Sequence, residues 1–133
     1  MQSAFVLAEK PIHELVPRLR KGLPAAMLEQ VADTLGFSAG LLAEKLGIAR
    51  RTLTRKQSNG EPLSREASEK ILRVARVRNL ARTLFTTDEA ISTWLSQPDS
   101  ALDDAAPLDL LDTELGAREV ENLLRALAHG HVV

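Results

Sequence analysis

Apolar residues recur at helical spacing along most of this chain, and this periodicity constrains the fold more strongly than any other feature of the sequence. The clearest example lies near the C-terminus, where Val120, Leu123, Leu124 and Leu127 stand at i, i+3, i+4 and i+7. That spacing places the four side chains on one face of an amphipathic helix. Aromatic residues, which favour strands, make up only 3% of the chain. We therefore predict an all-α fold.

Polar residues that suit helix N-caps indicate where the helices begin. Ser38 and Ser64 each precede a predicted helix, the second of which covers about residues 65–85. Thr86 and Glu89 have the spacing of a capping box. Residues 1–23 are ambiguous, because Pro17 would kink or stop a helix there and residues 5–7 could form a short strand or a docked arm. The predicted N-caps are Ser38, Ser64, Thr86 and Thr113.

The composition excludes several classes of protein. The chain has no cysteine, which excludes disulfide scaffolds, thiolate metal sites and cysteine nucleophiles. The longest uninterrupted apolar stretch, residues 4–8, is too short for a membrane span or a signal-peptide core. We expect a soluble cytoplasmic protein that has no membrane partner.

The formal net charge of −1 conceals two halves of opposite sign. Residues 1–85 hold 15 basic and 8 acidic residues, a net charge of +7, whereas residues 86–133 hold 2 and 10, a net charge of −8. We expect a domain boundary near Phe85 and a different partner for each half.

Residues 39–58 (AGLLAEKLGIARRTLTRKQS) carry the sharpest local signal. A helix-turn-helix needs a small residue where its helices cross, a residue that tolerates positive φ at the turn, and an apolar residue facing the core. Ala43, Gly47 and Leu53 meet these three requirements in order. The alternative is a plain helical hairpin with a solvated basic face.

The second helix of this motif would carry the DNA contacts, because its start and outer face reach base edges and phosphates. Arginine suits bidentate contact with guanine or phosphate. The expected contacts are Arg50, Arg51, Thr52 and Arg55, with Ser38, Lys56 and Ser58 as weaker candidates for phosphate contact.

Two segments resemble a known family. Residues 42–60 (LAEKLGIARRTLTRKQSNG) resemble the Xre/Cro-type repressor helix-turn-helix. Residues 83–130 are similar to the C-terminal region of Xre antitoxins from RES–Xre toxin–antitoxin pairs, and the two resemblances together cover about residues 24–131. The second rests on Trp94-Leu95, Pro107–Leu111, Asp112-Thr113, Gly116-Ala117, Val120 and Gly130.

This resemblance implies an antitoxin with a helix-turn-helix bundle over residues 1–85 and a small toxin-neutralising helical domain over residues 86–133. The partner would be a RES-domain toxin that depletes NAD, and the C-terminal region would occlude its NAD cleft. The helix-turn-helix would bind the promoter of the antitoxin's own operon. The resemblance also implies a homodimer that joins the toxin in a higher assembly and places two recognition helices about one DNA turn apart.

We expect residues 107–133 to carry the toxin contacts. An acidic surface would be attracted to a cleft that binds a dinucleotide phosphate, although acidic residues also serve solubility. Gly116 would allow either close approach of a partner or tight packing on Leu110 or Leu111. The candidates are Asp109, Asp112, Gly116, Arg118, Glu119, Glu121, Asn122, Arg125, His129 and His131.

Structural explanations compete with several of these assignments. Arg118 and Arg125 could instead form solvated salt bridges with Glu114 or Glu121. The two terminal histidines lack a third ligand in register, so we expect no metal site. Trp94 is expected in the core, with an interface anchor as the alternative.

The sequence contains no phosphate-binding glycine loop, nucleophile elbow or recognisable carboxylate pair. We therefore expect neither catalysis nor a cofactor. The alternative function is a stand-alone dimeric repressor without a toxin partner. For the dimer surface, the candidates are residues 1–23 and the long helix over 65–85.

Overall fold

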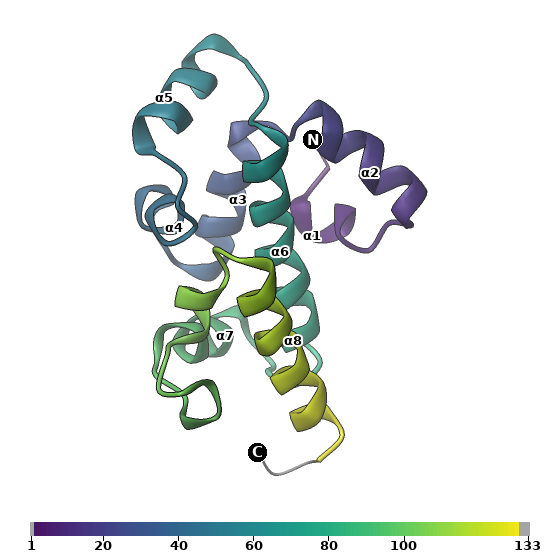
Figure 1. The fold of residues 1–133 in the computed structure, drawn as a ribbon, viewed down its shortest axis with the longest axis vertical. Helices are drawn as coiled ribbons and strands as arrows, with labels where there is room; N and C mark the ends of the chain where they lie inside the picture. The colour runs from purple at the N-terminus through teal and green to yellow at the C-terminus, as the bar shows by residue number, and fades with distance from the viewer. Residues whose placement is uncertain (1, 131–133) are drawn as a thin grey trace.

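The structure is a computed structural model that describes residues 2–130 (Figure 1). Those residues form helices joined by short connections and two isolated β-bridges, Pro24–Pro62 and Asp99–Ala105. The all-α prediction is therefore confirmed. The elements are α1 (Ala4–Leu7), α2 (Ile12–Lys21), α3 (Ala25–Leu35), α4 (Ala39–Lys45), α5 (Arg50–Asn59), α6 (Arg65–Ala81), α7 (Asp88–Ser96), the 3₁₀ turns η1 (Ser100–Leu102) and η2 (Pro107–Leu110), and α8 (Glu114–Ala128).

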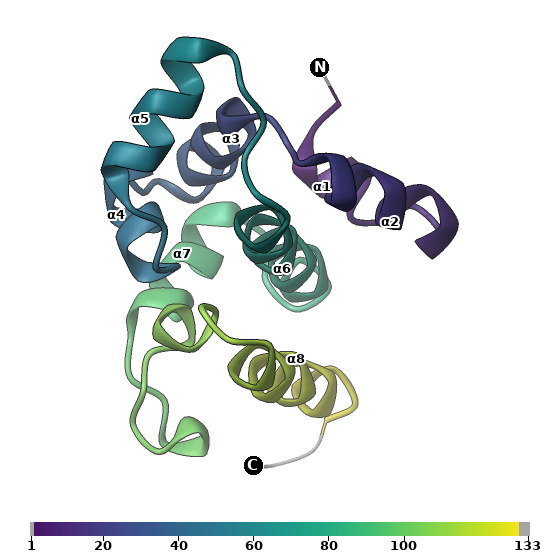
Figure 2. The same ribbon diagram turned by 45° about the horizontal axis from the view of Figure 1, so that its top comes forward.

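Helix α6 lies at the centre of the molecule and contacts α1, α2, α3, α7 and α8 (Figure 2). Most of its buried residues are apolar, which is what a helix covered on several sides requires. The exception is Ser68, whose hydroxyl donates to the Ser64 carbonyl (2.7 Å) and accepts from the Leu23 N–H (2.8 Å). This buried hydroxyl is fully paired and attaches the chain before α3 to α6.

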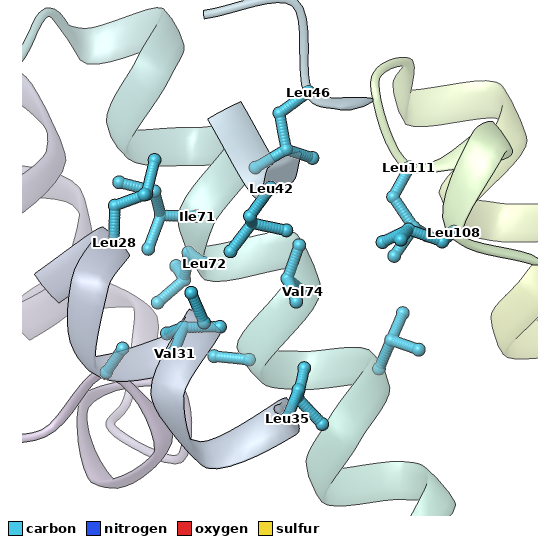
Figure 3. Close-up of a cluster of buried hydrophobic side chains, with 14 of the residues drawn as sticks. Leu28, Val31, Leu35, Leu42, Leu46, Ile71, Leu72, Val74, Leu108 and Leu111 are labelled. Atoms are coloured by element: carbon cyan, nitrogen blue, oxygen red, sulfur yellow. The ribbon is translucent and has the colours of Figure 1, made fainter. Parts of the chain in front are cut away.

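One continuous hydrophobic cluster joins the basic and acidic halves of the chain. Leu42 of α4 and Leu46 directly after it face this cluster together with residues of α3 and α6, and Leu108 and Leu111 extend it into the acidic half (Figure 3). Trp94 is partly buried against the same cluster and packs on Phe85, with ring centroids 5.9 Å apart. The two halves therefore share a core.

Most of the predicted helix caps are present. The hydroxyls of Ser38, Ser64 and Thr113 each accept from the backbone N–H three residues ahead. The prediction for Thr86 is wrong by one residue, because Thr87 caps α7 and accepts from the Ala90 N–H at 3.1 Å. The Thr86 carbonyl instead accepts from the Arg82 guanidinium, which holds this residue outside the helix.

The structure also shows where α6 ends and resolves the two ambiguities of residues 1–23. Helix α6 ends at Ala81 rather than Phe85, because the chain then tightens into i→i−3 turns, in which the Thr83 N–H donates to the Leu80 carbonyl (3.1 Å) and the Leu84 N–H to the Ala81 carbonyl (2.9 Å). Residues 5–7 lie in the helix α1, so the strand alternative is wrong. Pro17 lies within α2 and does not stop it. Pro17 is exposed, so water can replace the helix hydrogen bond that proline cannot make.

Arg78 fastens the start of α7 to α6. Its guanidinium makes two hydrogen bonds to the Asp88 carboxylate (2.8 and 3.0 Å) and lies 4.4 Å from the ring centroid of Phe5. The hydrogen bond from Arg78 lowers the pKa of Asp88. One arginine thus holds both the N-terminal helix and the first helix of the acidic half.

Across residues 2–130, no helix combines the length and apolar character needed to cross a membrane.

Candidate functional site

Helices α4 and α5 form the helix-turn-helix predicted over residues 39–58. Ala43 is fully buried where the two helices meet, and Gly47 has a φ of 71°, which glycine adopts without steric cost. Leu53 is 6% exposed and anchors α5 to the core. The Gln57 side-chain amide donates to the Glu29 carboxylate (2.7 Å), which further holds α5 against α3. Ala43, Gly47 and Leu53 therefore occupy the crossing, the turn and the core contact that the spacing predicted.

The outward face of α5 is basic. Arg51, Arg55 and Ser58 lie at i, i+4 and i+7 and are all exposed, as is Arg50 at the start of the helix. Thr52 is partly buried beside Leu53. Most of the predicted DNA contacts of α5 are therefore brought together on one side of the helix.

Two of the weaker candidates have structural partners within the chain. The Lys56 ammonium lies 3.5 Å from the Glu61 carboxylate, and its side chain is 24% exposed. The Ser38 hydroxyl accepts from the Leu41 N–H (3.0 Å) as the cap of α4. Both residues have a role in the fold, and their contact with phosphate stays a prediction.

Thr54 is a candidate that the sequence reasoning missed. It is exposed and follows Arg50 by four residues and Arg51 by three, so it lies between the arginines on the outer face of α5. The signal was available, because the same spacing that selects Arg51 and Arg55 also selects Thr54.

Arg50 lies against α4. A Cβ added at Gly40 would stand 2.8 Å from the Arg50 guanidinium carbon, so glycine at this position leaves room for the side chain. The Arg50 guanidinium also lies 4.0 Å from the Glu44 carboxylate. Arg50 therefore spans the two helices of the motif near the start of α4.

Four of the ten acidic residues of the C-terminal half pair with basic residues of the other half of the chain. The Asp109 carboxylate lies 2.6 Å from the Lys45 ammonium of α4, and the hydrogen bond that Lys45 donates to Asp109 raises the pKa of Lys45. Asp109 was predicted as a toxin contact, and the structure gives it a partner within the chain.

Glu114 and Glu121 pair with α6 rather than with arginines of their own helix. The Glu114 carboxylate lies 3.0 Å from the Arg73 guanidinium and 3.7 Å from that of Arg76, and Glu121 lies 3.6 Å from Arg76. The expected salt bridges from Arg118 or Arg125 to these glutamates are therefore wrong. Arg73 and Arg76 attract both carboxylates because α6 and α8 pack side by side (Figure 1).

The remaining toxin-contact candidates are mostly exposed. The outward side of α8 carries Arg118, Glu119, Asn122 and Arg125, and the exposed His129 directly follows the helix. Asp112 is also exposed, and its carbonyl accepts from Arg73 (3.3 Å). His131 lies outside the described residues. The sequence reasoning missed Leu115, which is 73% exposed and lies off the apolar stripe of α8.

Gly116 has a structural explanation within the chain. A Cβ at this position would stand 2.0 Å from the Leu110 carbonyl oxygen and 3.0 Å from the Leu110 Cβ. This contact supports the tight-packing interpretation, since η2 approaches the first turn of α8 too closely for any side chain.

No group of three or more His, Cys, Asp or Glu side chains within residues 2–130 is placed to hold a metal ion.

Gly116→Ala should lower the free energy of unfolding by about 1–3 kcal/mol, because η2 must move away from α8 to admit the methyl group. Chemical denaturation of the purified chain measures this change. The control Leu115→Ala, on the exposed face of the same turn, should stay within about 0.5 kcal/mol of wild type. Equal stability of Gly116→Ala and wild type would contradict the close packing.

Comparison with known proteins follows the same division of the chain. Residues 14–76 match the antitoxin Xre-like helix-turn-helix domain, and residues 80–130 match the antitoxin Xre/MbcA/ParS C-terminal toxin-binding domain. The antitoxin Xre of Photorhabdus laumondii is 31% identical over 115 residues, covering 86% of this chain and 78% of that protein. The antitoxin Xre of Yersinia enterocolitica is 32% identical over 117 residues, covering 87% and 79%.

A third relative is named Prs ADP-ribosylating antitoxin, from a Sphingobium species. It is 30% identical over 121 residues, which cover 84% of this chain and 76% of that protein. The matched domains bind DNA and toxin and are not those of an enzyme. The chain therefore belongs to the Xre family of antitoxins, in which a helix-turn-helix domain is joined to a C-terminal toxin-binding domain.

Proposed function

We propose that this antitoxin neutralises a RES-domain toxin by occluding its NAD cleft and represses its own operon through the helix-turn-helix. The observation that carries the proposal is the pairing, in one chain, of a basic outward face on α5 with a toxin-binding domain over residues 80–130. The name of the Sphingobium relative supports a partner that acts on NAD, because ADP-ribosylation consumes NAD. Repression of an operon requires the protein to be where the DNA is, so the proposed function implies a cytoplasmic location.

The two functions divide between residues 1–85 and 86–133, with DNA contact in the first part and toxin contact in the second. Because these parts share a core, the two functions would use different surfaces of one folded unit. Arg51 and Arg55 would read base edges and Arg50 would also contact phosphate, supported by the basic face that they form.

The active species would be a homodimer that presents two recognition helices about one DNA turn apart. Of the two candidate dimer surfaces, α6 is covered by five neighbouring helices. The N-terminal region is more available, since Val6 is 53% exposed and Ile12 is 76% exposed. We therefore place the dimer contact on α1 and α2, from which a higher assembly with toxin would be built.

Arg51→Ala and Arg55→Ala should each weaken binding to the DNA upstream of the gene by roughly 5- to 100-fold, the range for one bidentate base contact. Titration of labelled DNA at several salt concentrations measures this loss. Arg118→Ala, an arginine on α8, is the matched control and should bind DNA like wild type.

Toxin binding should survive the α5 substitutions. Loss of DNA binding together with toxin binding would mean that the fold was damaged, and unchanged DNA affinity of both α5 variants would contradict the assignment of the recognition face.

Co-expression with the product of an adjacent reading frame for a RES-domain protein tests the toxin partner. The two proteins should co-purify, and the antitoxin should restore the NAD content of cells that express the toxin. If no such frame exists, or if its product neither binds nor is neutralised, the chain acts as a stand-alone repressor.

A further inference from the structure

Helix α8 contains two pairs of residues that would normally form salt bridges along its surface. Glu114 precedes Arg118 by four residues, and Glu121 precedes Arg125 by four. A glutamate four residues before a basic residue is the favourable orientation for such a pair in a helix. In isolation, α8 would therefore neutralise both of its arginines.

Packing against α6 removes both glutamates from these pairs. Glu114 lies against Arg73 and Arg76, and Glu121 lies against Arg76. The pairs with α6 are better shielded from water, since the side chains of Arg73 and Glu121 are 12% and 13% exposed. Less solvated charges attract one another more strongly, so the pairs across α6 and α8 prevail over those along the surface.

Arg118 and Arg125 are consequently left exposed and without an ion pair among residues 2–130. They lie on one line of α8 with Leu115 and Asn122, at i, i+3, i+7 and i+10. The two arginines stand about 10 Å apart along the helix axis. This line, Leu115, Arg118, Asn122 and Arg125, is called the outer stripe of α8 below.

The outer stripe differs in charge from the half of the chain that contains it. Residues 86–133 carry a net charge of −8, but the stripe itself contains two arginines and no acidic residue. Its acidic neighbours on α8 are Glu119, Glu114 and Glu121. The acidic residues that would reverse its sign face Arg73 and Arg76 instead. The net charge of residues 86–133 therefore does not describe the charge of the surface that a partner would contact at the outer stripe.

We propose that the outer stripe of α8 docks on the toxin and that it requires an acidic toxin surface, with carboxylates facing Arg118 and Arg125 and an apolar contact for Leu115. This inference rests on the proposed function, because it takes the toxin-binding domain to contact a toxin. A planar guanidinium matches a carboxylate in bidentate geometry, and arginine is enriched at the energetic centres of protein interfaces. The proposal replaces the expected acidic contact surface with a cationic one.

The experiment uses the full-length antitoxin and, as the probe, the purified RES-domain protein encoded by the adjacent reading frame. Arg118→Glu/Arg125→Glu should raise the dissociation constant by roughly 10- to 100-fold, because two attractions become repulsions. Arg65→Glu, at an exposed position outside the stripe, is the matched control for each single substitution, Arg118→Glu and Arg125→Glu, because it makes the same change in net charge. Leu115→Ala should weaken binding by roughly 10-fold.

Three outcomes are distinguishable by calorimetry with this probe. Weaker binding by the stripe variants, with circular dichroism and operator affinity unchanged, supports the proposal. Wild-type affinity of Arg118→Glu/Arg125→Glu overturns it and leaves the proposed function intact. Absence of binding by the wild-type chain overturns the proposed function and the outer-stripe inference together.

Discussion

Helix α6 sets the constraint on which the rest of the structure depends, because it packs against five other helices at once. Seven of its eight buried residues are apolar. Several of its polar residues have specific partners in the neighbouring elements. Ser68 holds the chain before α3, Arg78 holds α1 and α7, and Arg73 and Arg76 hold α8. The helix-turn-helix and the α8 helix of the toxin-binding domain are thereby fixed on a common scaffold.

The opposite charges of the two halves serve this scaffold as well as outside partners. Arg73, Arg76 and Arg78 pair with carboxylates of the acidic half, and Lys45 of α4 pairs with Asp109. These pairs leave the basic face of α5 directed outward and leave Arg118 and Arg125 of α8 without an ion pair among residues 2–130. Each pair is partly exposed, so it contributes modestly to stability. The pairs matter more for surface charge than for stability, because they determine which charged side chains remain available to a partner.

Local signals in the sequence were reliable because their causes are local. Ser38 caps α4, and Gly47 takes the positive φ at the turn, as the spacing of the motif required. Contacts between distant segments were not predictable in the same way. The sequence alone pairs Glu114 with Arg118, and only the packing of α8 on α6 brings Arg73 within reach. One local signal was displaced by a residue: Thr87 rather than Thr86 caps α7, and the Thr86 carbonyl accepts from Arg82, four residues earlier.

Because the two halves share a core, we expect them to unfold as one cooperative unit, and Trp94 allows the most direct test. It is the only tryptophan and lies in the acidic half, where it packs on Phe85 at the boundary, whereas far-UV circular dichroism reports on helices throughout the chain. Urea unfolding followed by tryptophan fluorescence and by circular dichroism should give a single transition with the same midpoint. A fluorescence transition at lower urea concentration, with most of the helical signal retained, would contradict the shared scaffold.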